Sequence, residues 1–109
     1  MIPASQARLS RFANDRTADS IVLYATAALF TVSAATARTD SNLTPGEREA
    51  MSERFSARAV ELLDRTRAAG GFPSRAHVVR LLSDDSFDAL RGRGHFQQLV
   101  KKIESDLSN

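Results

Sequence analysis

The residues with the most scope for chemistry are two histidines and a group of aspartates: His77, His95, Asp84, Asp85 and Asp88. A metal pair on a helix would need a second ligand four residues after His77, where the chain has a leucine. A calcium loop would need alternating oxygen ligands and a closing glutamate about twelve positions along, where the chain has two glutamines. We therefore expect the aspartates to cap helices and His95 to lie on the surface. The chain is predicted not to be an enzyme, with no catalytic residue, metal or cofactor.

Other catalytic patterns are missing from the 109 residues. Cysteine is absent, which excludes a disulfide framework, a thiol nucleophile and a thiolate metal site. No serine stands in a Gly-x-Ser-x-Gly elbow. The stretch Gly92-Arg93-Gly94 is too short and isolated to cradle a phosphate. Fifteen basic residues are balanced by 13 acidic ones, which leaves a net charge of +2 with the signs interspersed. This balance predicts no specific binding to nucleic acid.

The elements that would position these residues are helices, and residues 20–37 organise them. This stretch has no charged residue, and its apolar residues recur at helical spacing. A helix that is apolar on most faces lies either among other helices or in a membrane. Its length is borderline for a span, which needs about 20 predominantly apolar residues. Its many small side chains suit close contact between helices. We therefore expect a central buried helix in a cytoplasmic protein without membrane contact.

A helical hairpin is predicted over residues 18–71. Its second helix starts at Thr44-Pro45-Gly46-Glu47, which combines a capping box with a proline in the first turn. The helix should run over residues 45–69. Gly70-Gly71 ends it, with one glycine in the left-handed conformation.

The flanking segments complete a single domain over residues 1–109. Segment 1–17 is expected to hold a short helix over residues 3–13 and a turn over residues 14–17. Segment 72–109 is expected to hold closing helices over residues 73–82 and 95–107, with a short helical turn from Asp84 between them. No segment shows sustained period-two alternation, so the sequence predicts an all-α fold of about five helices, one of them short.

Two stretches resemble the paired helices of a tetratricopeptide repeat. In LYATAALFTVSAA, Ala27 occupies the small close-contact position and Phe30 the aromatic one. In RFSARAVELLDRTRAAGGF, Ala59 is at the small position, Leu63 at the bulky one, and Gly71 stands where proline is usual. The resemblance implies a tetratricopeptide-like antiparallel hairpin in which Ala27 and Ala59 lie where the two long helices approach most closely.

The closing stretch DDSFDALRGRGHFQQLVKKIE is similar to the end of tetratricopeptide-type tails that follow bacterial eukaryotic-like serine/threonine kinase domains, particularly in planctomycetes. The pattern there is Asp, a bulky residue, Leu-Arg, a short break, then Phe and Leu on a closing helix. In this chain those residues are Asp84, Phe87, Leu90, Arg91, Phe96 and Leu99. Within the two repeat stretches, Tyr24 and Phe55 are further structural repeat positions. The chain departs from the family at Ala25 and Ala28, where an Asn and a Cys are usual. It contains no kinase elements.

The resemblance implies a non-catalytic protein–protein interaction scaffold, either a stand-alone relative or the detached tail of a kinase. Its partner would be a protein or peptide, or adjacent helical repeats. About three repeats are usually needed to bury the faces of such an array, and this chain offers about one and a half. A homo-oligomer, or a missing upstream region, is therefore a natural consequence. Self-association would use residues 3–13 or the exposed side of residues 20–37.

DNA binding is the alternative. The stretch LLDRTRAAGGFPSRAHVVRLL resembles the two helices of ribbon-helix-helix proteins, in which a glycine turn and a Ser-Arg pair open the second helix. Those proteins read the major groove with a β-strand from each subunit. In this chain residues 44–47 are a helix start, and no strand is predicted before them. A strand within residues 52–59 would favour this alternative.

Overall fold

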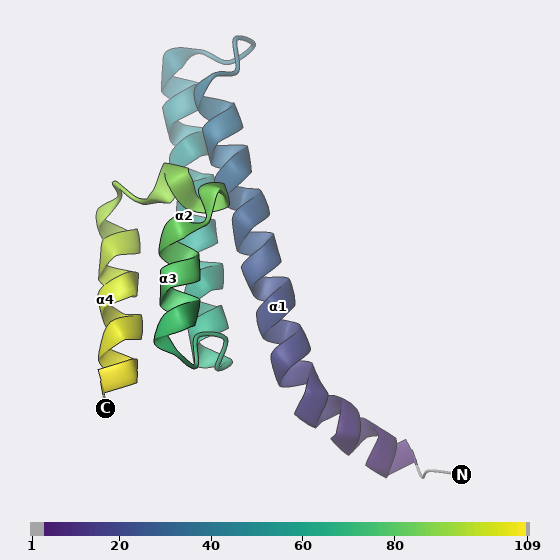
Figure 1. The fold of residues 1–109 in the computed structure, drawn as a ribbon. Helices are drawn as coiled ribbons and strands as arrows, with labels where there is room; N and C mark the ends of the chain where they lie inside the picture. The colour runs from purple at the N-terminus through teal and green to yellow at the C-terminus, as the bar shows by residue number, and fades with distance from the viewer. Residues whose placement is uncertain (1–3, 109) are drawn as a thin grey trace.

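Residues 4–108 fold into five helices joined by short loops. The structure, a computed structural model, describes residues 4–108, with side chains described from residue 19 onward. The elements are α1 (Ala4–Arg38), α2 (Pro45–Ala68), α3 (Arg75–Ser83), the 3₁₀ helix η1 (Asp85–Leu90) and α4 (Gly94–Ser108) (Figure 1). Residues 4–108 contain no β-strand. The predicted all-α class with about five helices, one of them short, is confirmed for that part of the chain.

α1 and α2 form an antiparallel hairpin that makes up most of the long dimension of the molecule (Figure 1). Small side chains are buried on both helices. They are Ala27, Thr31 and Ala34 on α1, and Ser52, Ser56 and Ala59 on α2. Small residues let two helix backbones approach closely. The hydroxyl of Thr31 donates to the carbonyl of Ala27 at 2.8 Å, so this buried polar group is satisfied within its own helix.

The predicted N-terminal arrangement is wrong. The structure has no turn at residues 14–17 and no separate short helix before it, because α1 is continuous from Ala4 to Arg38. Residues 4–38 contain neither glycine nor proline. The turn-favouring residues at positions 14–17 cost a helix only a fraction of a kcal/mol each, which is too little to break it. The first residue of the predicted short helix, residue 3, lies outside the described part of the chain.

The start and end of α2 are as predicted to within one residue. The Thr44 hydroxyl accepts from the Glu47 N–H at 3.2 Å, and the Glu47 carboxylate accepts from the Thr44 N–H at 2.9 Å, which completes the capping box. At the other end Gly70 has a φ of 79°, the left-handed conformation expected of one glycine. The Gly71 N–H then donates to the carbonyl of Thr66 at 2.8 Å.

The closing segment folds back on the hairpin. α3 and α4 are joined by η1, which lies across the hairpin against α1, and α4 packs on α2 and α3 (Figure 1). One apolar core joins all five elements, and its larger members are Leu62, Leu63, Phe72, Leu81, Phe87, Leu90, Phe96, Leu99 and Ile103. α3 begins at Arg75, two residues later than expected.

The prediction that residues 20–37 form a central buried helix is wrong. Only 28 % of the window Asp19–Arg38 is buried, and α1 lies along one edge of the molecule (Figure 1). α2 covers one face of α1 and η1 covers part of a second. No further helix among residues 4–108 covers the rest.

Candidate interaction surface

The two histidines lie on different helices, His77 on α3 and His95 on α4. His77 is exposed on α3, and its Nδ1 lies 2.8 Å from the Ser74 hydroxyl oxygen. His95 lies in the first turn of α4, with Nε2 4.0 Å from a carboxylate oxygen of Glu53. No group of three or more His, Asp or Glu side chains that could hold a metal occurs from residue 19 to residue 108.

The three aspartates lie at η1, and one of them caps this helix as predicted. Asp84 is the N-cap, and its carboxylate accepts from the Ser86 N–H at 3.0 Å. Arg91 closes the other end: it pairs with Asp88 and donates to the carbonyl of Asp84 at 2.8 Å. Asp85 is exposed in the first turn. The arginine of the Leu-Arg motif therefore holds η1 together from within the segment.

Tyr24 connects α1 to this capped turn. Its hydroxyl donates to the Asp84 carboxylate at 2.9 Å, and its ring packs edge-on against Phe87 at 5.1 Å and Phe72 at 6.2 Å. The Arg80 guanidinium lies 5.8 Å from the ring centre. The tyrosine is thus a structural tie between segments 60 residues apart.

The same contact shifts both ionisable groups. Burial, and then the hydrogen bond and negative charge of Asp84, raise the pKa of Tyr24 to about 12. Burial raises the pKa of the Asp84 carboxyl, but hydrogen bonds from the Ser86 N–H and the Tyr24 hydroxyl outweigh it and hold the pKa below its ordinary value. The pair therefore stays as a neutral phenol donating to a carboxylate.

Most of the proposed repeat positions are in the core. Those with an exposed fraction of 4 % or less are Ala27, Ala59, Leu63, Phe87, Leu90, Phe96 and Leu99. Phe30 and Phe55 are half-buried, and their ring centres are 6.0 Å apart across the hairpin. Gly71 lies against α1: a Cβ there would be 3.1 Å from the Cβ of Ser20.

A polar cleft of about 710 Å³ lies where the tip of the hairpin meets the loop before α4. Its charged residues are three arginines and three acids: Arg38, Arg48, Arg93, Glu49, Glu53 and Asp88. Arg93 pairs with Glu53 and donates to the Ser52 hydroxyl at 3.2 Å, and Arg48 donates to the carbonyl of Asp40 at 2.7 Å. The charges balance, so the cleft has no strong field for a charged ligand.

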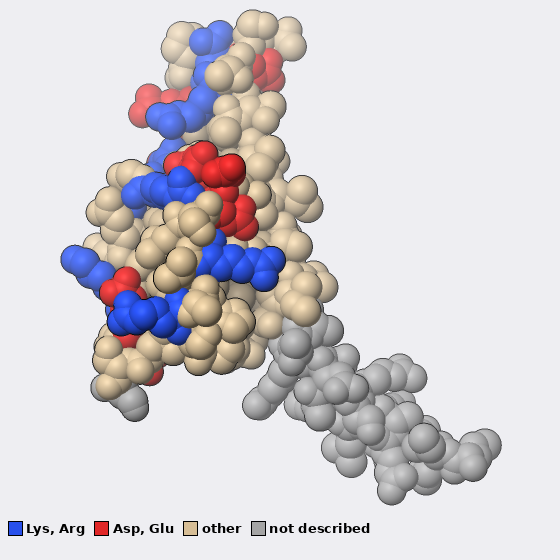
Figure 2. Space-filling view, viewed as in Figure 1, with Lys and Arg blue, Asp and Glu red and all other residues tan. Residues whose placement is uncertain are grey.

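The outer face of α1 is the most unusual surface of the molecule. Four large apolar side chains on it are more than half exposed: Ile21 (63 %), Val22 (61 %), Leu29 (68 %) and Val32 (51 %). We call this face, with the exposed Ala25, Ala35 and Thr36 between and beyond them, the α1 stripe. Figure 2 shows the edge of the molecule along residues 20–37 of α1 free of charged side chains, whereas Lys, Arg, Asp and Glu gather over the closing segment. Large exposed apolar patches are typical of sites that bind a protein, a membrane or a ligand.

Within the described residues, Asp19–Arg38 is also long and apolar enough to cross a membrane, judged by length and composition alone. Core helices of soluble proteins and signal sequences meet the same criterion.

The chain matches no protein-family model, no curated protein and no solved structure. Its function must therefore be argued from its own surfaces.

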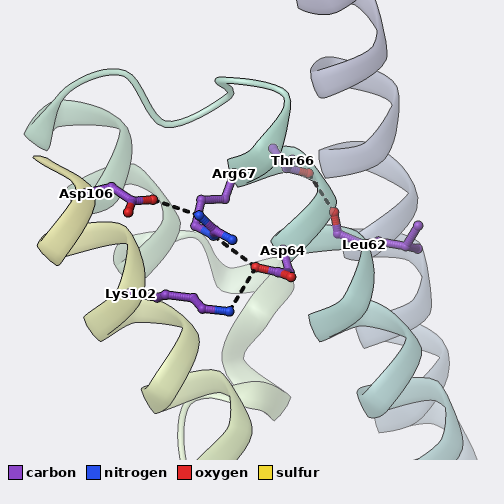
Figure 3. Close-up of polar contacts among 6 residues, drawn as sticks. All are labelled: Leu62, Asp64, Thr66, Arg67, Lys102 and Asp106. Atoms are coloured by element: carbon purple, nitrogen blue, oxygen red, sulfur yellow. Dashed lines mark hydrogen bonds and ion pairs between the residues drawn. The ribbon is translucent and has the colours of Figure 1, made fainter.

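One structural contact was not expected from the sequence. Arg67 on α2 bridges α2 and α4 (Figure 3). It donates to Asp64 at 2.9 Å and to Asp106 at 2.8 Å, and Lys102 lies 3.8 Å from the same Asp64 oxygen. The partner on α4 is 39 residues away in the sequence, so helical spacing within α2 could not reveal it.

Proposed function

We propose that this chain is a non-catalytic helical interaction module, in which the α1/α2 hairpin serves as a tetratricopeptide-like unit and the α1 stripe binds a protein or peptide partner. One observation carries the proposal: four large apolar side chains on a single helix face are each more than half exposed. Leaving such side chains in water forgoes about 25 cal/mol for each Å² that a partner would cover.

The architecture supports a repeat-like role. In a repeat array each helical hairpin buries its open face against the preceding one. Here the closing segment covers one side of the hairpin, while the outer face of α1 is uncovered (Figure 1). We extend the proposal, on the sequence resemblance alone, to a cytoplasmic module related to the tails of bacterial serine/threonine kinases. No enzymatic activity, metal or cofactor belongs to it.

The DNA-binding alternative loses its main requirement. α2 is helical throughout Pro45–Ala68, and residues 4–108 contain no strand that could enter a major groove. We therefore expect only weak retention on DNA at low salt, and nanomolar binding to a defined duplex at physiological salt would contradict the proposal.

Photo-cross-linking tests the proposed surface directly. A benzophenone-bearing residue replaces Leu29 on the stripe, or Val79 on α3 as the matched control, because Val79 is also apolar and 58 % exposed. Each protein is expressed and irradiated in cells, and the adducts are identified by mass spectrometry. We expect a discrete polypeptide adduct from position 29 and none from position 79. Absence of any polypeptide adduct at position 29 would refute the proposed function.

A further inference from the structure

We propose that the partner of the α1 stripe is a second copy of this chain, packed antiparallel along α1 about a two-fold axis. The inference rests on the proposed function, since it names the occupant of the same surface. The grounds are the pattern of the stripe, its size and the lack of basic residues from residue 20 to residue 37.

The stripe has the spacing of a coiled-coil seam. Val22, Ala25, Leu29, Val32 and Thr36 follow one another at intervals of three, four, three and four residues, and all five are exposed. This is the interval at which knobs of one helix enter holes of another. The seam therefore fits a single long helix running alongside α1.

The seam is complementary to a second copy of itself that runs in the opposite direction. A two-fold axis beside residue 27 places Val22 of one copy opposite Val32 of the other, and Ala25 opposite Leu29. The largest side chain of the seam thus faces the smallest, while the two valines face each other. In an isologous dimer each such contact occurs twice.

The residues on one side of the seam show the same pairing of a large side chain with a small one. In an antiparallel pair the same flank of each helix meets its counterpart, which brings Ile21 of one copy to Ala35 of the other. A groove of about 370 Å³ lies beside Val32 and Ala35, and its other side is lined by η1 residues, namely Asp85, Ser86, Asp88 and Ala89. Ile21, which is 63 % exposed, is the large side chain that the two-fold places over this groove.

The size of the stripe is sufficient for a dimer. Its four large side chains are between 51 % and 68 % exposed. They offer roughly 100 Å² each, and the small residues among them bring the stripe to about 600 Å². Two copies would bury about 1,200 Å², the lower limit for stable specific interfaces. We therefore expect a dissociation constant on the order of micromolar.

The composition of α1 argues against lipid. A helix that lies on a lipid surface carries Lys and Arg along its polar face, and α1 has none from residue 20 to residue 37.

Sedimentation of the full chain tests the dimer. We expect the parent to sediment as a dimer at tens of micromolar, Leu29→Glu as a folded monomer and Val79→Glu as a dimer. A carboxylate buried without a partner should weaken association at least about 100-fold. Circular dichroism confirms folding, and Leu29→Ser serves as a milder second variant. A monomeric parent, or a dimer in all variants, would overturn the proposal.

Disulfide trapping tests the orientation, because the chain has no cysteine of its own. The variants Val22→Cys and Val32→Cys are mixed and oxidised. Antiparallel pairing predicts a mixed disulfide between the two variants. Disulfides only between identical chains would show parallel pairing and overturn the two-fold described above.

The outcomes separate this inference from the proposed function. A different polypeptide cross-linked at position 29 of a monomeric chain would keep the interaction module and refute the dimer. Binding of a monomeric chain to phosphatidylcholine–phosphatidylglycerol vesicles, abolished by Leu29→Glu, would refute the dimer in favour of lipid. A vesicle-independent dimer lost in Leu29→Glu supports both.

Discussion

The substitution Gly71→Ala is predicted to destabilise the fold because the new Cβ has no space. It would lie 2.5 Å from Thr66 Cγ2, 2.9 Å from the Thr66 carbonyl oxygen and 3.1 Å from Ser20 Cβ. The carbonyl oxygen is backbone and already accepts from the Gly71 N–H at 2.8 Å. The turn therefore cannot move away without weakening that hydrogen bond.

The expected loss is about 2–3 kcal/mol, the upper part of the range for overpacking, since a backbone atom is among the obstacles. For a domain of about 100 residues, 1 kcal/mol shifts the melting temperature by about 4 °C or more. Thermal unfolding followed by circular dichroism should thus show a decrease of roughly 8–12 °C.

Two other glycines separate the steric effect from backbone effects. Gly46 lies in the first turn of α2 with nothing within 4 Å of an added Cβ, so Gly46→Ala should leave the melting temperature unchanged or slightly raised. Gly70 has equal space but a φ of 79°, so Gly70→Ala should cost about 1–2 kcal/mol through backbone strain alone. If Gly71→Ala and Gly46→Ala have the same melting temperature, the close packing of Gly71 against Thr66 and α1 is wrong.

A second substitution tests the identity of the clash. Thr66→Ser removes Cγ2 but keeps the hydroxyl that donates to the Leu62 carbonyl at 2.8 Å. The double variant with Gly71→Ala should lose less stability than the sum of the two single variants, by about 1 kcal/mol. Strict additivity would show that Thr66 does not occupy the space beside Gly71.

Three further predictions concern other contacts. Ultraviolet titration of the single tyrosine should give a pKa near 12 for Tyr24, and Asp84→Ala should lower it toward the ordinary value. Since the folded state keeps the Tyr24 proton that the unfolded chain releases near pH 10, stability should fall between about pH 10 and 12. If Tyr24 instead titrates near pH 10, the Tyr24–Asp84 contact is contradicted. Ala59→Leu should cost about 1–3 kcal/mol in thermal melts, because the site is fully buried, and unchanged melting would show that α1 and α2 do not pack closely there. In urea unfolding, Arg67→Ala should lower the free energy of unfolding by about 1 kcal/mol. Arg65→Ala should leave it almost unchanged, because the Arg65 side chain is 58 % exposed. Equal losses in the two variants would contradict the α2–α4 bridge.

Local signals in the sequence predicted the helix ends well. The capping box at Thr44 and Glu47, the left-handed glycine at position 70 and the cap at Asp84 each depend on residues within three positions of one another. Such short-range hydrogen bonds and backbone preferences do not need the rest of the fold. The failed turn at residues 14–17 shows the limit of local signals, because weak turn propensity alone does not stop a helix.

Contacts between distant segments could not be read in the same way. Tyr24 and Asp84 are separated by 60 residues, and Arg67 and Asp106 by 39. Asp84, Arg67 and Asp106 are ordinary surface residues when judged by their neighbours in the sequence, and Tyr24 is one position of an apolar helix. The extent to which the α1 stripe is exposed was underestimated for the same reason: apolar periodicity predicts a helix that needs covering, but not how many helices remain to cover it.

Three threonines of α1 direct their hydroxyl groups to the backbone of the helix itself. The hydroxyls of Thr26, Thr31 and Thr36 donate to the carbonyls of Val22, Ala27 and Val32 at 2.7, 2.8 and 3.0 Å. Thr36, at the end of the stripe, therefore presents a methyl group much as a valine would. Association through this face should have the calorimetric signature of dehydrated hydrocarbon, with a negative heat-capacity change. It should also strengthen in sulfate, which favours burial of apolar surface.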